Sequence, residues 1–314
     1  MPTGSNHNPP ARIGATLGGS IVAIVTPMQA NGDVDYGALD ALVDWHLASG
    51  THGIVPVGTT GESATLTVPE HLVVIQRVVQ RVNQRVPVIA GTGANATAEA
   101  IALTRAARDA GVDACLLVTP YYNRPPQEGL FRHYAAVAEA VDIPQILYNV
   151  PSRTACDLKP ETIARLAPLP NIVGIKEASG DVARVARIRE LCGAQFVVLC
   201  GEDALNLEFM KSGARGAISV TANVVPAQMA RFCSAMLAGR FAEAAAIDAR
   251  LQPLHAMLFV ETNPIPVKYA LQHLGRIGSG IRLPLVPLAA ERRPALAALL
   301  DSVADSAADS AGHG

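Results

Sequence analysis

The residue with the clearest chemistry in this chain is a lysine at the end of an apolar run. Lys176 follows residues 172–175, which are typical of a buried strand, where a charged ammonium is costly. Burial favours the neutral amine, and a neutral lysine is a nucleophile that attacks ketones to form an imine. The alternative is a structural lysine paired with a carboxylate, for which Glu177 is the nearest candidate. We interpret the other lysines, which occur near a helix start or in helix-like stretches, as ordinary: Lys159, Lys211 and Lys268.

Hydroxyl, phenol and guanidinium side chains elsewhere in the chain would complement such an amine. Imine formation needs several proton transfers, and Tyr148 is a suitable acid and base for them. Arg153 can hold a carboxylate through two parallel hydrogen bonds, and the hydroxyls of Thr59 and Thr60 can hold a second one. Each has an ordinary alternative, since threonines cap helices, tyrosines pack in loops and arginines lie on surfaces. Together they suit a substrate that is an oxo acid.

One repeated pattern would bring these residues together. Short apolar runs end in small or polar residues, and stretches with helical periodicity follow them, such as 97–110, which Gly111 should end. Strands that alternate with helices pair in parallel, and eight such units predict a closed (β/α)₈ TIM barrel with its site at the C-terminal ends of the strands. The runs occupy residues 20–27, 53–60, 87–93, 114–120, 144–150, 172–178, 195–202 and 216–223.

The second possible architecture is an open doubly wound sheet. Such sheets usually carry a G-x-G-x-x-G fingerprint after a strand. The nearest match, at residues 91–93, lacks the third glycine, so we interpret it as a tight turn between a strand and a helix. The pattern therefore favours the barrel.

The domain organisation follows from the barrel. We predict that residues 18–238 form it and that residues 239–297 add C-terminal helices, which are clearest at 241–257 and 264–274 and could cover one face or form a subunit contact. The polar tails have little apolar surface to bury and are expected to be disordered. These tails are residues 1–17 and 298–314.

The composition argues against several other functions. A formal net charge of −2 and an aromatic content of 4% give neither the basic field nor the stacking surface that nucleic acids require. No apolar run has the length of a membrane span, and residues 1–14 lack the apolar core of a signal peptide, so we expect a cytoplasmic protein. The five cysteines are odd in number and widely spaced, which favours reduced thiols over disulfides.

Motifs for metals, nucleotides and serine hydrolases are missing from the sequence. It has no H-E-x-x-H, no cluster of His and Cys, no P-loop and no G-x-S-x-G. The end of the eighth run, residues 219–225, has no glycine-rich turn for a phosphate group, which favours unphosphorylated substrates. We therefore expect neither a metal nor a cofactor.

Six short motifs lie in order along the chain, most of them at the ends of predicted strands. They are GTTGES at 58–63, GTGAN at 91–95, TPYYN at 119–123, YNVPSRT at 148–154, GIKEAS at 174–179 and ISVTAN at 218–223. With these motifs the chain resembles the 4-hydroxy-tetrahydrodipicolinate (dihydrodipicolinate) synthases. This group belongs to the pyruvate-dependent lysine aldolase family, which includes N-acetylneuraminate lyase. The resemblance covers residues 18–287.

The resemblance implies a mechanism. Lys176 would form an imine with pyruvate, the imine would become an enamine, and the enamine would attack the aldehyde of L-aspartate 4-semialdehyde. The substrate amine would then displace Lys176 and close the ring. The proton relay of the family maps onto Thr59, Tyr148 and Tyr122. Its second tyrosine reaches in from a neighbouring subunit, which implies a homo-oligomer, typically a tetramer built from dimers. Thr60 would hold the pyruvate carboxylate.

The resemblance also assigns substrate-binding positions. Gly201 and Ile218 correspond to backbone positions that line the pyruvate pocket, and Arg153 would bind the carboxylate of the aldehyde substrate. Sialic acid lyases lack the Pro-Ser-Arg-Thr form of residues 151–154 and more often have Ser-Thr in place of the Thr-Thr pair, so both features favour the synthases. Another pyruvate aldolase or lyase remains the alternative. A non-catalytic barrel is a remote one, because it would be expected to have lost the lysine, the tyrosine or the arginine.

Many members of the group are inhibited by L-lysine at a cleft in the dimer interface. Asn95 and Glu99 lie four residues apart and could share one face at a helix start, where Glu99 would pair the effector's ammonium and Asn95 would take its carboxylate. Val68 departs from the family, which commonly has histidine there. A solvated helix surface is the alternative for His71 and Glu99. The positions implied for this site are Ser63, Ala64, His71, Asn95, Glu99 and Tyr121.

Overall fold

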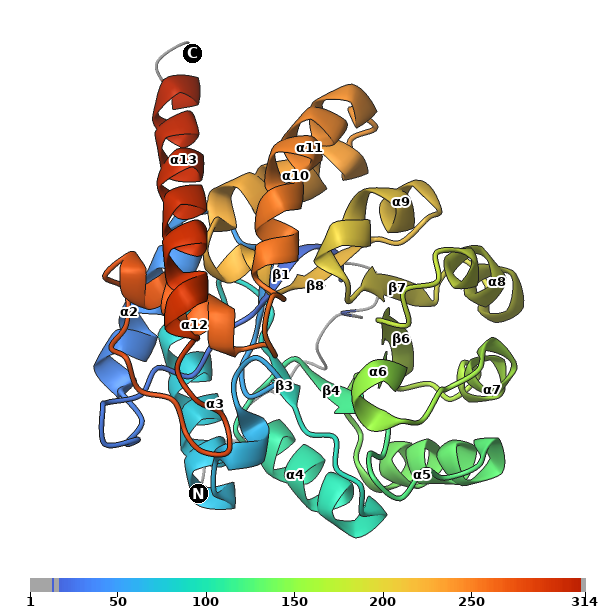
Figure 1. Ribbon diagram of the computed structural model, residues 1–314. Coiled ribbons are helices and arrows are strands. Elements are labelled where there is room, and N and C mark those ends of the chain that lie inside the picture. Colours follow the sequence, from blue (N-terminus) through green and yellow to red (C-terminus); the bar gives the residue numbers. More distant parts are fainter. Residues whose placement is uncertain (1–12, 14–16, 312–314) are drawn as a thin grey trace, which may run out of the picture.

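A ring of parallel strands enclosed by helices forms the body of the computed structural model, which describes residue 13 and residues 17–311 (Figure 1). The strand order is β2-β1-β8-β7-β6-β5-β4-β3, and a parallel bridge between Ile54 and Val88 joins its two ends. The predicted (β/α)₈ barrel is therefore confirmed. The strands are β1 Gly19–Ala23, β2 Gly53–Val55, β3 Ile89–Gly91, β4 Ala114–Val118, β5 Gln145–Asn149, β6 Ile172–Glu177, β7 Val197–Cys200 and β8 Gly216–Ser219.

Helices follow the strands and surround the barrel. The helix predicted at 97–110 is α4, and Gly111 follows it with the left-handed φ of +88° that a helix-ending glycine adopts. The helices of the described residues are α2 Tyr36–Ala48, α3 Val68–Val82, α4 Thr97–Asp109, α5 Gln127–Ala140, α6 Pro151–Thr154, α7 Pro160–Leu166, α8 Ala183–Cys192, α9 Asn206–Lys211, α10 Pro226–Leu237, α11 Phe241–Met257, α12 Ile265–His273 and α13 Arg293–Ala311. Single 3₁₀ turns are η1 Ser63–Thr65, η2 Asp203–Leu205, η3 Thr221–Asn223 and η4 Ala290–Arg292.

The predicted apolar runs are longer than the strands because their last residues form loops at the mouth of the barrel. The clearest case is β2, which ends at Val55 although the run continues to residue 60. Pro56 has no amide hydrogen for the ladder, and Val57 has a left-handed φ of 49°. A Cβ on Gly91 would lie 2.4 Å from the Val57 carbonyl oxygen, so only glycine fits at this turn.

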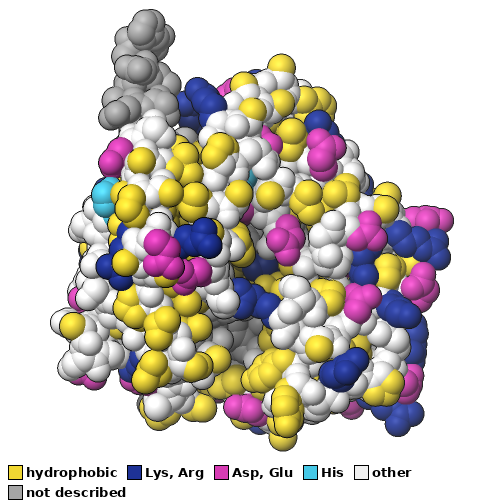
Figure 2. All heavy atoms as spheres, in the orientation of Figure 1, with side chains coloured by type: hydrophobic (Ala, Val, Ile, Leu, Met, Phe, Trp, Pro, Cys, Tyr) yellow, Lys and Arg dark blue, Asp and Glu magenta, His cyan; other side chains and the backbone are white. Residues whose placement is uncertain are grey.

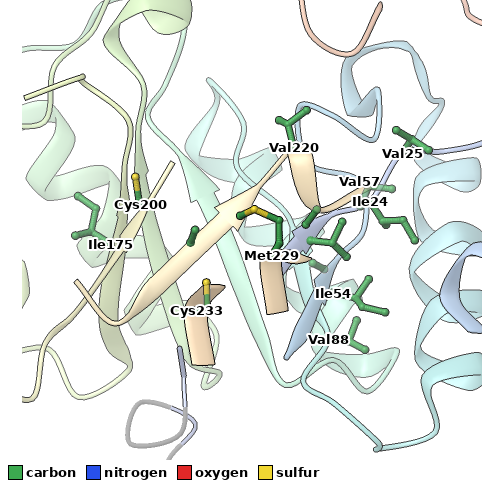
Figure 3. Close-up of a cluster of buried hydrophobic side chains, with 14 of the residues drawn as sticks. Ile24, Val25, Ile54, Val57, Val88, Ile175, Cys200, Val220, Met229 and Cys233 are labelled. Carbon is green, nitrogen blue, oxygen red and sulfur yellow. The ribbon is translucent and has the colours of Figure 1, made fainter. Parts of the chain in front are cut away.

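Two apolar layers hold the barrel and its helices together. One layer fills the interior of the barrel and includes Ile21, Leu116 and Ile218. The other lies between the strands and the helices. Figure 3 shows part of that outer layer, with Ile175 pointing away from the interior of the barrel. Because neighbouring residues of a strand point to opposite faces, each strand serves both layers, and the polar residues that the site needs must come from the strand ends.

The described residues near each end of the chain differ from the prediction of disordered tails. Ile13 and Leu17 are buried with the interior layer, and the rest of the tail 1–17 lies outside the described residues. The tail predicted from residue 298 is helical as far as residue 311, because α13 continues through it. Leu296, Leu300 and Val303 are spaced four and three residues apart and are buried where α13 packs on α11 and α12.

The structure also bears on the predictions made for the C-terminal helices, the cysteines and membrane spans. The first predicted C-terminal helix coincides with α11, and the second contains α12. The cysteines are free thiols, buried except for the half-buried Cys192. Within the described residues, no helix combines the length and apolarity needed to cross a membrane.

Candidate active site

A cavity of about 520 Å³ lies where the C-terminal ends of the strands meet the loops that follow them. Figure 2 shows the face of the molecule seen in Figure 1; it is hollowed near the centre of the ring, and Lys and Arg side chains border the hollow. The predicted convergence is confirmed for six residues from the ends of β2, β5, β6 and β7. These residues are Thr59, Thr60, Tyr148, Arg153, Lys176 and Gly201.

Lys176 is buried in this cavity beside the ring of a tyrosine. Its side chain comes from β6 beside Tyr148 of β5, and its Nζ lies 4.3 Å from the centre of the Tyr148 ring. Lys176 is 6% exposed, and no carboxylate of the described residues forms an ion pair with it. Glu177 points to the other face of the strand, where it accepts a hydrogen bond from Asn149 at 3.1 Å and pairs with Arg184 at 3.3 Å. The interpretation of Lys176 as the partner of Glu177 is therefore wrong.

Gly201 makes room for the lysine side chain. A Cβ at this position would lie 2.9 Å from Lys176 Cε and 2.7 Å from the Cβ of Ala178. Only glycine therefore lets β7 pass this close to the lysine. Ile218 does not line the cavity. It pairs with Ile21 one layer deeper in the barrel, and Val220, two residues further along the chain, forms the wall instead.

A chain of hydrogen bonds connects the predicted carboxylate-binding groups. Asn263 Nδ2 donates to Thr60 Oγ1 at 3.0 Å, and Arg153 Nη2 donates to the carbonyl oxygen of Asn263 at 3.2 Å. Neither threonine caps the next helix, because Thr67 is the N-cap of α3. The hydroxyl and the guanidinium are thus held at the same wall of the cavity by a residue of the C-terminal extension.

Sequence reasoning missed two groups of residues in this cavity. Glu202 follows β7, and burial raises the pKa of its carboxyl, while the charges of Lys176 and Arg153 oppose that rise. The loop between α11 and α12 supplies the other group, which is Phe259, Glu261, Thr262 and Asn263. The position of Glu202 one residue after Gly201 was a signal in the sequence, since it ends an apolar run. The loop gave none, because only the packing of the extension brings it over the barrel.

A second cleft of about 540 Å³ adjoins the cavity and shares part of its wall. Burial lowers the pKa of His71, on α3, to about 4, so this imidazole is neutral at physiological pH. Burial and the nearby charge of Glu99 raise the pKa of Tyr121. A solvated helix surface is therefore the wrong interpretation for His71, whereas Glu99 is exposed. Five of the implied lysine-binding residues line this cleft: Ser63, Ala64, His71, Glu99 and Tyr121.

Besides Ile218, two further predicted residues lie outside both cavities. Asn95 precedes α4, which starts only at Thr97, so it does not share a helical face with Glu99, and it does not line the cleft. Tyr122 has a left-handed φ of 72° and is 90% exposed, and it does not line the cavity that contains Lys176.

Comparison with known proteins places this arrangement in a family. A model of the Dihydrodipicolinate synthetase family matches residues 16–303. The chain belongs to this family. The 4-hydroxy-tetrahydrodipicolinate synthase of Alcanivorax borkumensis is 60% identical over 278 residues, which are 88% of this chain and 95% of the relative. That of Pseudomonas aeruginosa is 59% identical over 269 residues, 86% of this chain and 92% of the relative.

Solved structures of the family share the fold. The chloride-inhibited dihydrodipicolinate synthase of Acinetobacter baumannii, complexed with pyruvate, superposes with a TM-score of 0.90 and 52% identity over 91% of this chain and 98% of that one. The enzyme of Cyanidioschyzon merolae with lysine bound gives a TM-score of 0.87 and 40% identity over 90% and 97% of the two chains. The barrel, the lyase class and the synthase reaction predicted from the sequence are those of this family, which favours the synthase over N-acetylneuraminate lyase.

Proposed function

We propose that the chain joins pyruvate to L-aspartate 4-semialdehyde through an imine on Lys176, in the cytoplasmic biosynthesis of diaminopimelate and lysine. The observation that carries this proposal is a lysine that is buried, faces a cavity and has no ion-pair partner among the described residues. Such an amine is not tied to a carboxylate in an ion pair, and it is free to attack the ketone of a substrate in the cavity.

The chemistry proceeds in four steps. The Lys176 amine adds to the ketone carbon of pyruvate, and water leaves to give the imine. The imine then loses a proton from the pyruvate methyl group and becomes an enamine. The enamine carbon attacks the aldehyde carbon of the second substrate, whose oxygen becomes a hydroxyl. Finally the amino group of that substrate adds to the imine carbon, the ring closes, and Lys176 is released as a free amine.

The polar wall of the cavity supports the placement of both substrates. Thr60 is the proposed donor to the pyruvate carboxylate, with neighbouring backbone N–H groups. Arg153 is the proposed partner of the carboxylate of the aldehyde substrate, because its guanidinium borders the same cavity and can form a bidentate pair. The amino group of that substrate also needs a partner while it is charged, and Glu202 is the proposed one, because its carboxyl lines the same cavity and interacts with the charges of Lys176 and Arg153.

Proton transfer is the proposed role of Tyr148, Thr59 and Tyr122. Tyr148 and Thr59 line the cavity, whereas the exposure of Tyr122 supports its use by the site of a neighbouring subunit. The site would then be complete only in a homo-oligomer, for which we propose a tetramer built from dimers. L-Lysine is the proposed inhibitor at the second cleft. The apolar Val68 in its wall offers that ligand no hydrogen bond, so we expect weak inhibition.

Borohydride trapping tests the proposed function. The protein is incubated with pyruvate, reduced with borohydride, and examined by intact and peptide mass spectrometry. We expect one reduced pyruvyl adduct per chain, on Lys176, and consumption of pyruvate when aspartate semialdehyde is added. An adduct on Lys159, Lys211 or Lys268, or none at all, would contradict the mechanism. An adduct on Lys176 with turnover only of N-acetylmannosamine would point to the lyase instead.

A further inference from the structure

A second buried lysine lies behind the wall of the substrate cavity. Lys268 of α12 donates a hydrogen bond to Glu62 Oε1, and the two side chains are 5% and 0% exposed. The interpretation of Lys268 as an ordinary helical lysine is therefore wrong. Burying two charges costs several kcal/mol per ion, which their attraction offsets only in part, so the pair calls for an explanation beyond stability.

The Glu62 end of this pair belongs to the turn that carries the two predicted threonines. The backbone N–H of Glu62 donates to the carbonyl oxygen of Thr59 at 3.1 Å, and Glu62 itself has a left-handed φ of 56°. The Thr26 hydroxyl donates to the carbonyl oxygen of Gly61 at 2.7 Å. The Glu62 carboxylate is thus anchored two residues from Thr60, within one closed turn.

The Lys268 end belongs to the helix that begins beside Asn263. The backbone N–H of Lys268 donates to the carbonyl oxygen of Pro264 at 3.0 Å, in the first turn of α12. Asn263, one residue earlier, bonds to the Thr60 hydroxyl through its side chain and to Arg153 through its carbonyl oxygen. The ion pair and the polar wall of the cavity therefore connect the same two segments of the chain.

A third segment of the chain, at Arg282, forms a hydrogen bond to the second oxygen of the Glu62 carboxylate. The backbone N–H of Arg282 donates to Glu62 Oε2 at 3.3 Å. The Arg282 guanidinium donates to the carbonyl oxygen of Thr65 at 2.9 Å and to Glu70 Oε2 of α3 at 2.9 Å. Both carboxylate oxygens of Glu62 are thus bonded, which a buried charge requires.

We propose that the Glu62–Lys268 ion pair is a positioning pair, which fixes the turn 58–63 against the start of α12 so that Thr60, Asn263 and Arg153 meet in the cavity. This inference rests on the proposed substrate-binding roles of Thr60 and Arg153. Two apolar side chains would stabilise the same packing. They would not set its register as a charge-assisted hydrogen bond does, because apolar contact has no direction.

Variants that remove one or both charges separate positioning from stability. Lys268→Met leaves the Glu62 carboxylate buried without its ion-pair partner, so the melting temperature of this variant should fall. The double variant Glu62→Gln/Lys268→Met contains neither charge and should recover most of that loss. We nevertheless expect the double variant to need about tenfold more pyruvate for half-maximal imine formation, the effect of weakening one hydrogen bond to a charged group. Saturating pyruvate should still label Lys176 completely, because the nucleophile is intact.

The exposed pair Glu208–Lys211 of α9 provides a matched control, with side chains that are 56% and 44% exposed. The double variant Glu208→Gln/Lys211→Met should keep the wild-type half-saturation and melting temperature. Positioning is overturned if the buried double variant recovers its stability and binds pyruvate as the wild type does. Where that variant does not fold, Glu62→Gln alone serves as the test: weaker half-saturation supports the proposal, and an unchanged value overturns it. Absence of any adduct in the wild type would instead overturn the proposed function.

Discussion

The two buried lysines of this protein are in opposite situations. Counted over the whole residue, Lys176 and Lys268 are 6% and 4% exposed, so burial does not distinguish them. Lys268 is paired with Glu62, whose charge opposes the lowering of the Lys268 pKa by burial. Lys176 has no such partner among the described residues and lies over the ring of Tyr148. One amine is used in a hydrogen bond, and the other is left free beside a cavity.

The difference shows which feature identifies a candidate nucleophile. A carboxylate partner holds the proton on a buried lysine and occupies the direction from which a substrate would approach. A free amine beside a cavity meets neither obstacle, and the glycine at position 201 keeps the space around Lys176 open. The pairing and the access to a cavity therefore carry the functional information, and burial by itself does not.

The largest expected effect comes from removing the free amine. Lys176→Ala should form no imine with pyruvate and should lose synthase activity entirely, because no other described lysine faces the cavity. Borohydride trapping with peptide mass spectrometry checks this, with circular dichroism to show that the variant is folded. A pyruvyl adduct on Lys268 in this variant would break the comparison, since it would mean that the ion pair does not protect the second lysine.

The second-largest effect is expected at Tyr148, whose ring lies beside the free amine of Lys176. Tyr148→Phe keeps the ring over which the Lys176 amine lies but removes the phenol, so the imine should still form. Turnover should fall by ~10²–10⁴ if the phenol carries protons during the reaction. Steady-state kinetics and trapping are measured on the same preparation. Wild-type turnover in the variant would remove Tyr148 from the proton relay.

The contrast between the two lysines also explains what the sequence could and could not predict. Lys176 stood out because it ends an apolar strand, and strand burial shows in a run of neighbouring residues. Lys268 did not stand out, because its burial depends on Glu62, which lies 206 residues earlier in the chain. Asn263 was missed for the same reason, since its partner Thr60 is 203 residues away.

Local patterns predicted the fold more accurately than they predicted which residues line the cavity and how far the last helix extends. The barrel and the convergence of strand ends followed from alternation alone, because parallel strands in a closed sheet have few possible arrangements. Whether Ile218 lines the cavity could not be predicted, because only two residues separate it from Val220, which follows β8 and forms the cavity wall. The helix α13 was missed because its few large apolar residues, of which three are buried, stand among many small ones and give a weak periodic signal.

A smaller effect is expected at the mouth of the cavity. Arg153→Ala should raise the KM for aspartate semialdehyde by roughly 10–100-fold, the effect of losing a charged hydrogen-bonding partner, and should leave trapping by pyruvate unchanged. Arg187→Ala is a suitable control, because Arg187 is an exposed arginine on α8 that pairs with Glu190 on the surface. Equal losses for both substrates would instead indicate that Arg153 supports the polar wall as a whole.

The smallest expected effect concerns the charges that surround the paired lysine. The Arg282 guanidinium, hydrogen-bonded to Glu70, lowers the pKa of that carboxyl from 4.5 to about 2. The unfolded chain therefore binds more protons as the pH falls below 4.5, so the stability that this pair contributes is present above that pH and is lost as the pH falls towards 2. Because the pair is partly exposed, we expect a loss of only about 1 kcal/mol.

Denaturant unfolding at pH 6 and pH 3 measures this contribution in the wild type and in Arg282→Met. The variant should be less stable at pH 6, and the gap in unfolding free energy should narrow at pH 3, because there the unfolded wild type binds a proton at Glu70 while the folded protein mostly does not. At neutral pH both the wild type and Arg282→Met should still form the imine on Lys176 completely. A gap of constant size would assign the effect of Arg282 to its backbone contacts with Gly32 and Thr65, which do not titrate. The Arg282–Glu70 ion pair would then contribute no electrostatic stability near Lys268. Glu62 would be the one charged group of the described residues that distinguishes the paired lysine from the free one.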